Sequence, residues 1–518
     1  MDANQLLTNT LSPDQAIRTD AEQKLEAAAR DSYPVYMSTL AAELANESSP
    51  SHIRTAAGLA VKNALTARDP TRVEEYTARW TLLPQAGRDE IKQKVLSTLG
   101  SQEHRAGTAA AQVIAAIAAI ELPVGLWNEL IAQLLGAMGD ASNMRLRQAA
   151  LQAIGFTCEG ISSDVLAAQS NEILTAVIQG ARKEEPSPEV QLAALQALYN
   201  SLEFVRANFE REGERNYIMQ VVCEATQSPN IAVKIAAYEC LVRTMQLYYD
   251  KMRFYMEQAL FGLTVLGMRD SEPKVALQAV EFWSTVCDEE IELALEAEEA
   301  AEFGEDPERA CYNFARIALP EIVPVLLELL KTQDEDADED EWDVSKAAGT
   351  CVGLLAQVVG DDIVRLAVPF VEGNIKNPDW HAREAAHRRQ GHRRLDARTH
   401  LGPLLRLDQD RRPPPSARPG ARARPPGRAT HRDQLLLGHH EPLGAARRQR
   451  SLVRDRRRRG RGALHAALAL LRGHRRQPAP GDGPQLERIQ QPHLGVRGAG
   501  QRRHPLRCRL RSPGERRA

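Results

Sequence analysis

One short pattern recurs along the chain at nearly constant spacing and constrains the fold more than any other feature. A β-branched residue or Leu is followed three and four positions later by two small residues. Copies begin at Leu146, Val190, Val233 and Val275, at steps of 44, 43 and 42 residues, and only the last departs, with Gln278 at its first small position. Positions i, i+3 and i+4 share one face of a helix. Each copy therefore predicts a helix that carries small side chains on one face.

A second helix is expected in every repeat, because an amphipathic run precedes three of the copies, at 173–180, 217–226 and 254–268. Serine suits the N-cap of a helix and proline suits its first turn. Such punctuation stands before the same three pattern helices, at Ser187-Pro188, Ser228-Pro229 and Ser271-Glu272-Pro273. A period of about 40–47 residues with two helices per unit is typical of HEAT or armadillo repeats. We therefore predict an all-α fold over 1–386, a HEAT-repeat α-α solenoid coiled into a right-handed superhelix.

The spacing of the pattern is broken once by an acidic insertion. The copy at Val344 follows Val275 by 69 residues, which is one repeat plus about 27 residues. The extra residues include 289–305 and the acidic loop 334–343, in which seven of the eight residues from 334 to 341 are carboxylic acids. A run of like charges is often only a solvated loop held open by repulsion. The same charges also create a potential that attracts a Lys/Arg-rich partner.

The last quarter of the sequence differs in composition from the rest. Residues 388–518 hold 34 of the 66 basic residues and 9 of the 69 acidic ones, which leaves 32 basic and 60 acidic residues in 1–387. From His387 onward there is no Phe, Trp, Tyr, Met or Lys, and Arg, Pro and Gly dominate. Such a segment buries too little apolar surface to offset its chain entropy. We predict that 387–518 is a disordered basic tail.

A shifted reading frame explains this tail. Synonymous codons for 387–396 can be written so that a shift of one base reads Ile-Ala-Ala-Lys-Gly-Ile-Val-Asp-Ser. The same shift over 431–444 reads Ile-Ala-Ile-Asn-Cys-Phe-Trp-Ala-Ile-Met-Asn-Leu-Ser. Both readings continue a helical apolar pattern, so we interpret 387–518 as a frameshift product.

Several classes of function are disfavoured by the residues present. The seven cysteines contain no Cys-x-x-Cys, and 1–387 contains only His52, His104, His381 and His387, without metal-ligand spacing. We find no phosphate-binding glycine loop and no His-Glu-x-x-His. The first eight residues lack the features of a signal peptide, and the apolar run 109–122 is too short to span a bilayer. We therefore expect an intracellular protein that is not an enzyme and uses no metal or cofactor.

Several stretches of 1–386 resemble the importin β (karyopherin β) family of nuclear import receptors. The similar segments are 57–65, 183–187, 200–204, 219–227, 281–290, 340–349 and 374–380. The resemblance implies that the family's N-terminal region lies at about 20–100 and that its acidic loop is 334–343. It also implies a carrier found in cytoplasm, nucleus and nuclear pore. The implied partners are Ran-GTP, Phe-Gly nucleoporins and an importin-α adaptor or basic cargo, although later repeats of the family hold the adaptor's basic arm. No membrane or nucleic-acid partner is implied.

The resemblance also implies three groups of binding residues. The Ran-binding candidates are Lys62, Asn63, Glu281, Asp288, Asp338, Glu339, Asp340 and Glu341. The nucleoporin-binding candidates are Leu174, Thr175, Ile178, Glu214, Tyr217 and Ile218. The adaptor or cargo candidate is Trp342. Each group has a plainer interpretation. Lys62 could simply be a cation at a helix C-terminus, and the nucleoporin group could simply pack between repeats. Trp342 could only hold the acidic loop against the stack.

Two other functions remain open at this point. A different HEAT scaffold, for example one that organises a phosphatase, would share the periodicity but would not need the acidic loop. A nucleic-acid binder could use the tail around 456–459, where four arginines are consecutive. The absence of Lys and of interleaved aromatic residues in that tail argues against this second function.

Overall fold

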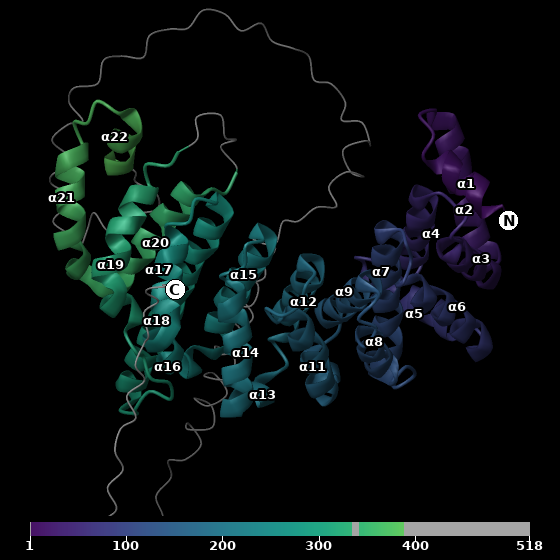
Figure 1. Ribbon diagram of the computed structural model, residues 1–518, viewed down its shortest axis with the longest axis horizontal. Coiled ribbons are helices and arrows are strands. Elements are labelled where there is room, and N and C mark those ends of the chain that lie inside the picture. Colours follow the sequence, from purple (N-terminus) through teal and green to yellow (C-terminus); the bar gives the residue numbers. More distant parts are fainter. Residues whose placement is uncertain (1, 334–340, 388–518) are drawn as a thin grey trace, which may run out of the picture. The chain divides into compact units, whose positions relative to one another are not determined.

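The computed structural model describes residues 2–333 and 341–387, and within these ranges the chain is helical with no β-strand. Figure 1 shows the helices following one another along the chain, from α1 to α22. The predicted tail lies outside the described residues, except for its first position, His387, which ends α22. Most of the acidic loop, including Asp338, Glu339 and Asp340, also lies outside them.

The helices have the following bounds. The first half contains α1 (Ala3–Thr10), α2 (Gln15–Asp31), α3 (Tyr33–Ala45), α4 (Ser51–Asn63), α5 (Pro70–Thr81), α6 (Gln85–Thr98), α7 (His104–Glu121), α8 (Leu130–Met138), α9 (Met144–Gly160), α10 (Ser163–Leu166) and α11 (Ser170–Ala181). The second half contains α12 (Pro188–Ser201), α13 (Arg206–Glu210), α14 (Glu212–Ala225), α15 (Ile231–Tyr248), α16 (Arg253–Tyr255), α17 (Phe261–Met268), α18 (Pro273–Phe303), α19 (Phe314–Leu329), α20 (Val344–Val359), α21 (Val364–Asn374) and α22 (Trp380–His387).

The predicted pairing of helices is confirmed. The pattern helices α9, α12, α15, α18 and α20 form one layer together with α4 and α7, and each helix of this series packs against the next along the chain. The helix before each of them packs on it, as α8 does on α9 and α11 on α12, and α11 contacts both α8 and α14 in a second layer. One helix pair cannot bury its own apolar face, but neighbouring pairs cover each other. The chain is therefore a two-layered stack of helical repeats.

Small side chains allow the pattern helices to approach closely. Ala150, Ala194 and Ala237 are fully buried in successive repeats. A Cβ atom built on Gly155 of α9 would lie 3.3 Å from the Ala197 Cα of α12. Leu, Ile and Val side chains around these positions fill the remaining space between the helices.

The helix starts follow the predicted chemistry at α12, but the caps of α15 and α18 are Asn230 and Glu272 rather than serines. Ser187 caps α12, since its Oγ accepts a hydrogen bond from the Val190 N–H at 3.3 Å. In the next repeat the cap is Asn230, whose Oδ1 accepts from the Val233 N–H at 3.2 Å, and Ser228 instead accepts from the Asn230 N–H. The Ser-Pro pair thus forms the turn before α15 rather than its cap.

The acidic insertion is only partly a loop. Residues 289–303 continue α18, which runs unbroken for 31 residues from Pro273 to Phe303. The chain then returns along this helix, where Arg309 makes two hydrogen bonds to Glu296, at 2.6 and 3.0 Å. Half of the inserted sequence is therefore an acidic extension of a repeat helix.

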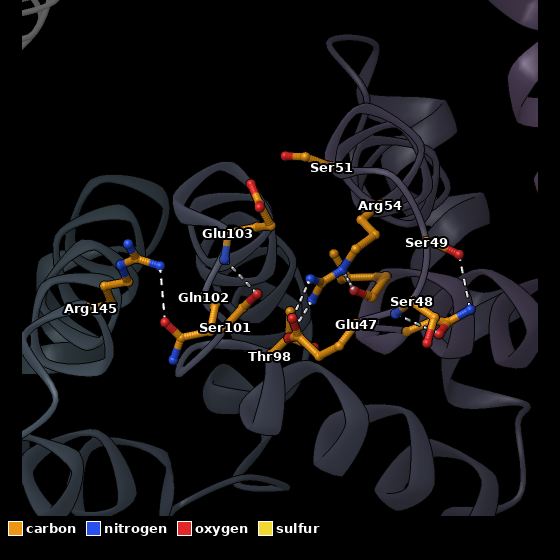
Figure 2. Close-up of polar contacts among 12 residues, drawn as sticks. Glu47, Ser48, Ser49, Ser51, Arg54, Thr98, Ser101, Gln102, Glu103 and Arg145 are labelled. Carbon is orange, nitrogen blue, oxygen red and sulfur yellow. Dashed lines mark hydrogen bonds and ion pairs between the residues drawn. The ribbon is translucent and has the colours of Figure 1, made fainter.

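Polar contacts also join the first repeats (Figure 2). The Arg54 guanidinium is fully buried, donates to the Leu44 carbonyl at 2.8 Å and makes two 2.9 Å bonds to the Glu47 carboxylate. Further along, Arg145 donates to the Gln102 side chain at 3.3 Å, from one repeat to the previous one. A buried charge needs such partners to offset its lost hydration.

One apolar stretch is longer than the sequence pattern indicated. By length and composition alone, the described stretch His104–Val124 could cross a membrane, although the apolar run 109–122 within it is shorter than a bilayer span requires. In the structure 61% of that window is buried, and α7 packs against α4, α6 and α9. This helix therefore packs against helices of its own repeat and of both neighbouring repeats.

We predict that Gly155→Leu destabilises the stack, because a larger side chain would overlap the backbone of α12 at Ala197. Overpacking of this kind costs about 1–3 kcal/mol. The matched control is Gly136→Ala in α8, where nothing lies within 4 Å of the added atom and a gain of about 0.5–1 kcal/mol is expected. Urea unfolding followed by circular dichroism measures both changes. Equal stability of the two variants would contradict the close contact.

Candidate partner-binding surfaces

The six nucleoporin-binding candidates are brought together on two neighbouring helices, α11 and α14, which pack side by side. The apolar side chains of Leu174, Ile178 and Ile218 are 6%, 6% and 3% exposed. Thr175 is exposed, and the Tyr217 ring is 45% exposed. Packing between repeats, the plainer interpretation, holds for the three buried residues. We name the six residues together the α11–α14 slot; three of them are buried apolar residues, and Thr175, Glu214 and Tyr217 are exposed.

Glu214 is exposed and lies within a set of polar contacts that could not be predicted from the sequence. Its carboxylate forms a 2.7 Å ion pair with Arg211 and accepts a 2.7 Å hydrogen bond from Asn208. Both of these residues also donate to Asn171 Oδ1 on α11, at 3.0 and 2.7 Å. We call Asn171, Asn208, Arg211 and Glu214 the polar ring. The i, i+3 spacing of Arg211 and Glu214 could have suggested the ion pair, whereas the two asparagines carry no sequence signal.

On α18, Glu281 meets Trp342, although the resemblance assigned them to different partners. The Trp342 indole N–H donates to Glu281 Oε1 at 3.1 Å. Lys346 donates to the Glu341 carbonyl at 2.5 Å, so the end of the acidic loop is tied to the start of α20 as well as to α18. The hydrogen bond between Trp342 and Glu281 favours the interpretation that Trp342 pins the acidic loop. Asp288 lies on the same helix, about two turns beyond Glu281.

The base of the acidic extension is anchored by Glu290, which is 1% exposed. Its carboxylate accepts from the Tyr249 hydroxyl at 2.9 Å and from the main-chain N–H groups of Phe314 and Ala315 at 2.5 and 3.3 Å. Burial raises the pKa of Glu290, and these three hydrogen bonds oppose that change. The side chain caps α19, whose own N-cap residue Asn313 makes no side-chain capping bond.

Lys62 and Asn63 lie on a helix that is separated from the acidic candidates on α18 by several helices of the stack. They end α4, and α7, α9, α12 and α15 are stacked between α4 and α18. The Lys62 ammonium donates to Gln112 Oε1 of α7 at 3.2 Å, and Asn63 is exposed. The plainer interpretation of Lys62 as a cation in a last helical turn is compatible with this position.

The Trp342 pin gives a prediction about the loop. Trp342→Phe keeps an aromatic ring but removes the indole N–H that bonds to Glu281. One such bond stabilises by about 0.5–1.5 kcal/mol, so amide exchange in 341–350 should become roughly two- to tenfold faster. Hydrogen–deuterium exchange with mass spectrometry measures this, with 314–329 of the same variant as the internal control. Unchanged exchange in 341–350 would mean that the bond does not hold the loop.

The sequence of this chain matches known proteins over much of its length. The family profile described as "Importin-beta N-terminal domain" matches residues 21–101. Importin subunit beta-1 of Schizosaccharomyces pombe is 58% identical over 386 residues, which cover 74% of this chain and 45% of that protein. Importin subunit beta-1 of Saccharomyces cerevisiae is 44% identical over 386 residues, with coverage of 74% and 44%. The chain thus spans less than half the length of these relatives.

Solved structures show the same relationship. A crystal structure of importin β superposes with a TM-score of 0.70 at 51% identity, covering 74% of this chain and 45% of that one. Kap95p structures concerned with RanGDP and with Nup1 give TM-scores of 0.68 and 0.66, each at 43% identity and with coverage of 74% and 45%. Over the matched residues, the chain belongs to the importin β family and has its HEAT-repeat fold.

Proposed function

We propose that this chain is a nuclear transport receptor, which binds Phe-Gly nucleoporins at the α11–α14 slot and Ran-GTP at the pattern helices. The observation that carries the proposal is the contact between α11 and α14, which brings the six candidates onto two neighbouring helices with the Tyr217 ring 45% exposed. A shallow apolar site for a single Phe ring suits weak and multivalent binding, which rapid passage through a pore requires. The complex of the related Kap95 with Nup1 supports this partner class.

The charge of the solenoid supports the second partner. Residues 1–387 carry 60 acidic and 32 basic residues, and α18 with the acidic loop concentrates the excess of carboxylates. Such a surface attracts a basic protein and speeds its association. The structure of related Kap95p with RanGDP, in which Kap95p induces the GTP-bound conformation of the switch loops, supports Ran as that protein. Glu281, Asp288 and 338–341 are the proposed acidic contacts.

The remaining parts of the proposal follow from the same family. An importin-α adaptor or a basic cargo segment would approach Trp342, whose N–H bonds to Glu281. We expect the protein in cytoplasm and nucleus and at the nuclear envelope. The identity of 58% to an importin β relative favours transport over a phosphatase scaffold. The arginines proposed for nucleic-acid binding lie outside the described residues.

The slot gives the first binding prediction. Tyr217→Ala should weaken binding of a synthetic peptide with two Phe-Gly repeats by about tenfold, since truncating an aromatic contact at an interface costs more than about 1 kcal/mol. The matched control is Leu82→Ala, because Leu82 is 83% exposed between α5 and α6. Fluorescence anisotropy with the full chain measures the Kd. If both variants bind like the unchanged protein, Tyr217 is not part of a Phe site.

The acidic surface gives the second binding prediction. Asp288→Lys should slow association with Ran-GTP several-fold at low salt, and the difference should shrink as salt rises. Asp31→Lys on α2 changes the net charge by the same amount at an exposed site and serves as control. Surface plasmon resonance with Ran-GTP and Ran-GDP measures the rates. Equal slowing by both substitutions would indicate a general charge effect rather than contact at α18.

A further inference from the structure

Asn208 is the buried member of the polar ring and has no role in the function proposed above. It lies on α13 (Arg206–Glu210), between the two helices of the slot, and is 2% exposed. Its side-chain Nδ2 donates to Asn171 Oδ1 on α11 and to Glu214 Oε2 on α14, both at 2.7 Å. One buried amide group therefore links the N-terminal turns of both slot helices.

The orientation of this amide follows from its neighbours. Both hydrogens of Nδ2 are used on acceptors, while Asn208 Oδ1 is buried and has no hydrogen-bond partner among the described residues. Turning the amide over would direct that oxygen at the Glu214 carboxylate, which accepts hydrogen bonds but cannot donate one. A buried acceptor without a partner is unfavourable for folding. Asn208 is thus poorly explained as a residue that only stabilises the fold.

The Glu214 carboxylate retains acceptor capacity after these contacts. Its two oxygens receive Arg211 and Asn208, and the side chain is still 45% exposed. A carboxylate has about four lone-pair sites, so each oxygen can accept a further bond. Main-chain N–H groups of an extended peptide are donors of the required kind, and Gly after Phe lets the peptide backbone come close.

We propose that Asn208 is a positioning residue of the α11–α14 slot. It holds Glu214 and Asn171 so that the carboxylate stands ready for the main-chain N–H of a bound Phe-Gly peptide. The polar ring thereby fixes the surface beside the exposed Tyr217, which receives the Phe ring. This inference rests on the proposed nucleoporin binding and assigns a residue that acts through Glu214.

The test compares Asn208→Ala with a matched asparagine in the full chain. Asn208→Ala should weaken binding of the two-repeat Phe-Gly peptide about fivefold, which is the effect of losing one well-placed hydrogen bond. The unfolding midpoint should stay nearly unchanged, because the substitution also removes the buried oxygen that has no partner. Asn200→Ala is the control, since its Nδ2 donates to the Gly155 carbonyl between α12 and α9. It should leave peptide affinity unchanged.

A double-mutant cycle separates positioning from a general structural effect. In a Glu214→Ala background, Asn208→Ala should cause no further loss of affinity, because its effect passes through the missing carboxylate. Full additivity of the two substitutions, or wild-type affinity of Asn208→Ala, would overturn the inference while leaving the slot intact. A wild-type chain that does not bind the peptide would overturn the proposed nucleoporin binding itself, and the inference with it.

Discussion

Close approach between the pattern helices is the constraint on which the rest of the structure depends. At Gly155 and Ala197 the backbones of α9 and α12 come so near that an added Cβ would lie 3.3 Å from the facing backbone. This contact sets the distance between α9 and α12. It therefore also sets the distance between α8 and α11, which pack on these two helices. The α11–α14 slot depends on the packing of α12 against α15, because α11 packs on α12 and α14 packs on α15. Residues outside the proposed binding site thus set the spacing of its two helices.

Buried charges form a second set of constraints, both within a repeat and between repeats. Glu121, at the end of α7, is fully buried and accepts from the Trp80 indole, Arg88 and Lys92 at 2.9–3.0 Å. Arg147 and Glu185 form a similar buried pair between α9 and the turn before α12. Removing one partner of such a pair costs about 3–5 kcal/mol, because the other charge stays buried. These contacts fix the positions of neighbouring helices, whereas the small residues determine how closely the pattern helices approach.

Much of the fold could be predicted from sequence because its signals are local. The small-residue pattern at Val190 or Val233 depends on residues four positions apart, and helical periodicity reveals it. The candidates of the slot came from family resemblance, and the stack places them on neighbouring helices. The polar ring could not be predicted, since Asn171 and Asn208 are 37 positions apart and meet only after the repeats stack. The link between Glu281 and Trp342 was missed for the same reason, because 61 residues separate them.

A structure of the full chain bound to a Phe-Gly peptide tests the central claim most directly, because it locates the ligand without relying on a substitution. Our account predicts a Phe ring between α11 and α14 beside Tyr217, with a peptide N–H directed at the Glu214 carboxylate. A Phe ring found only elsewhere on the stack, with the α11–α14 slot empty, would contradict it.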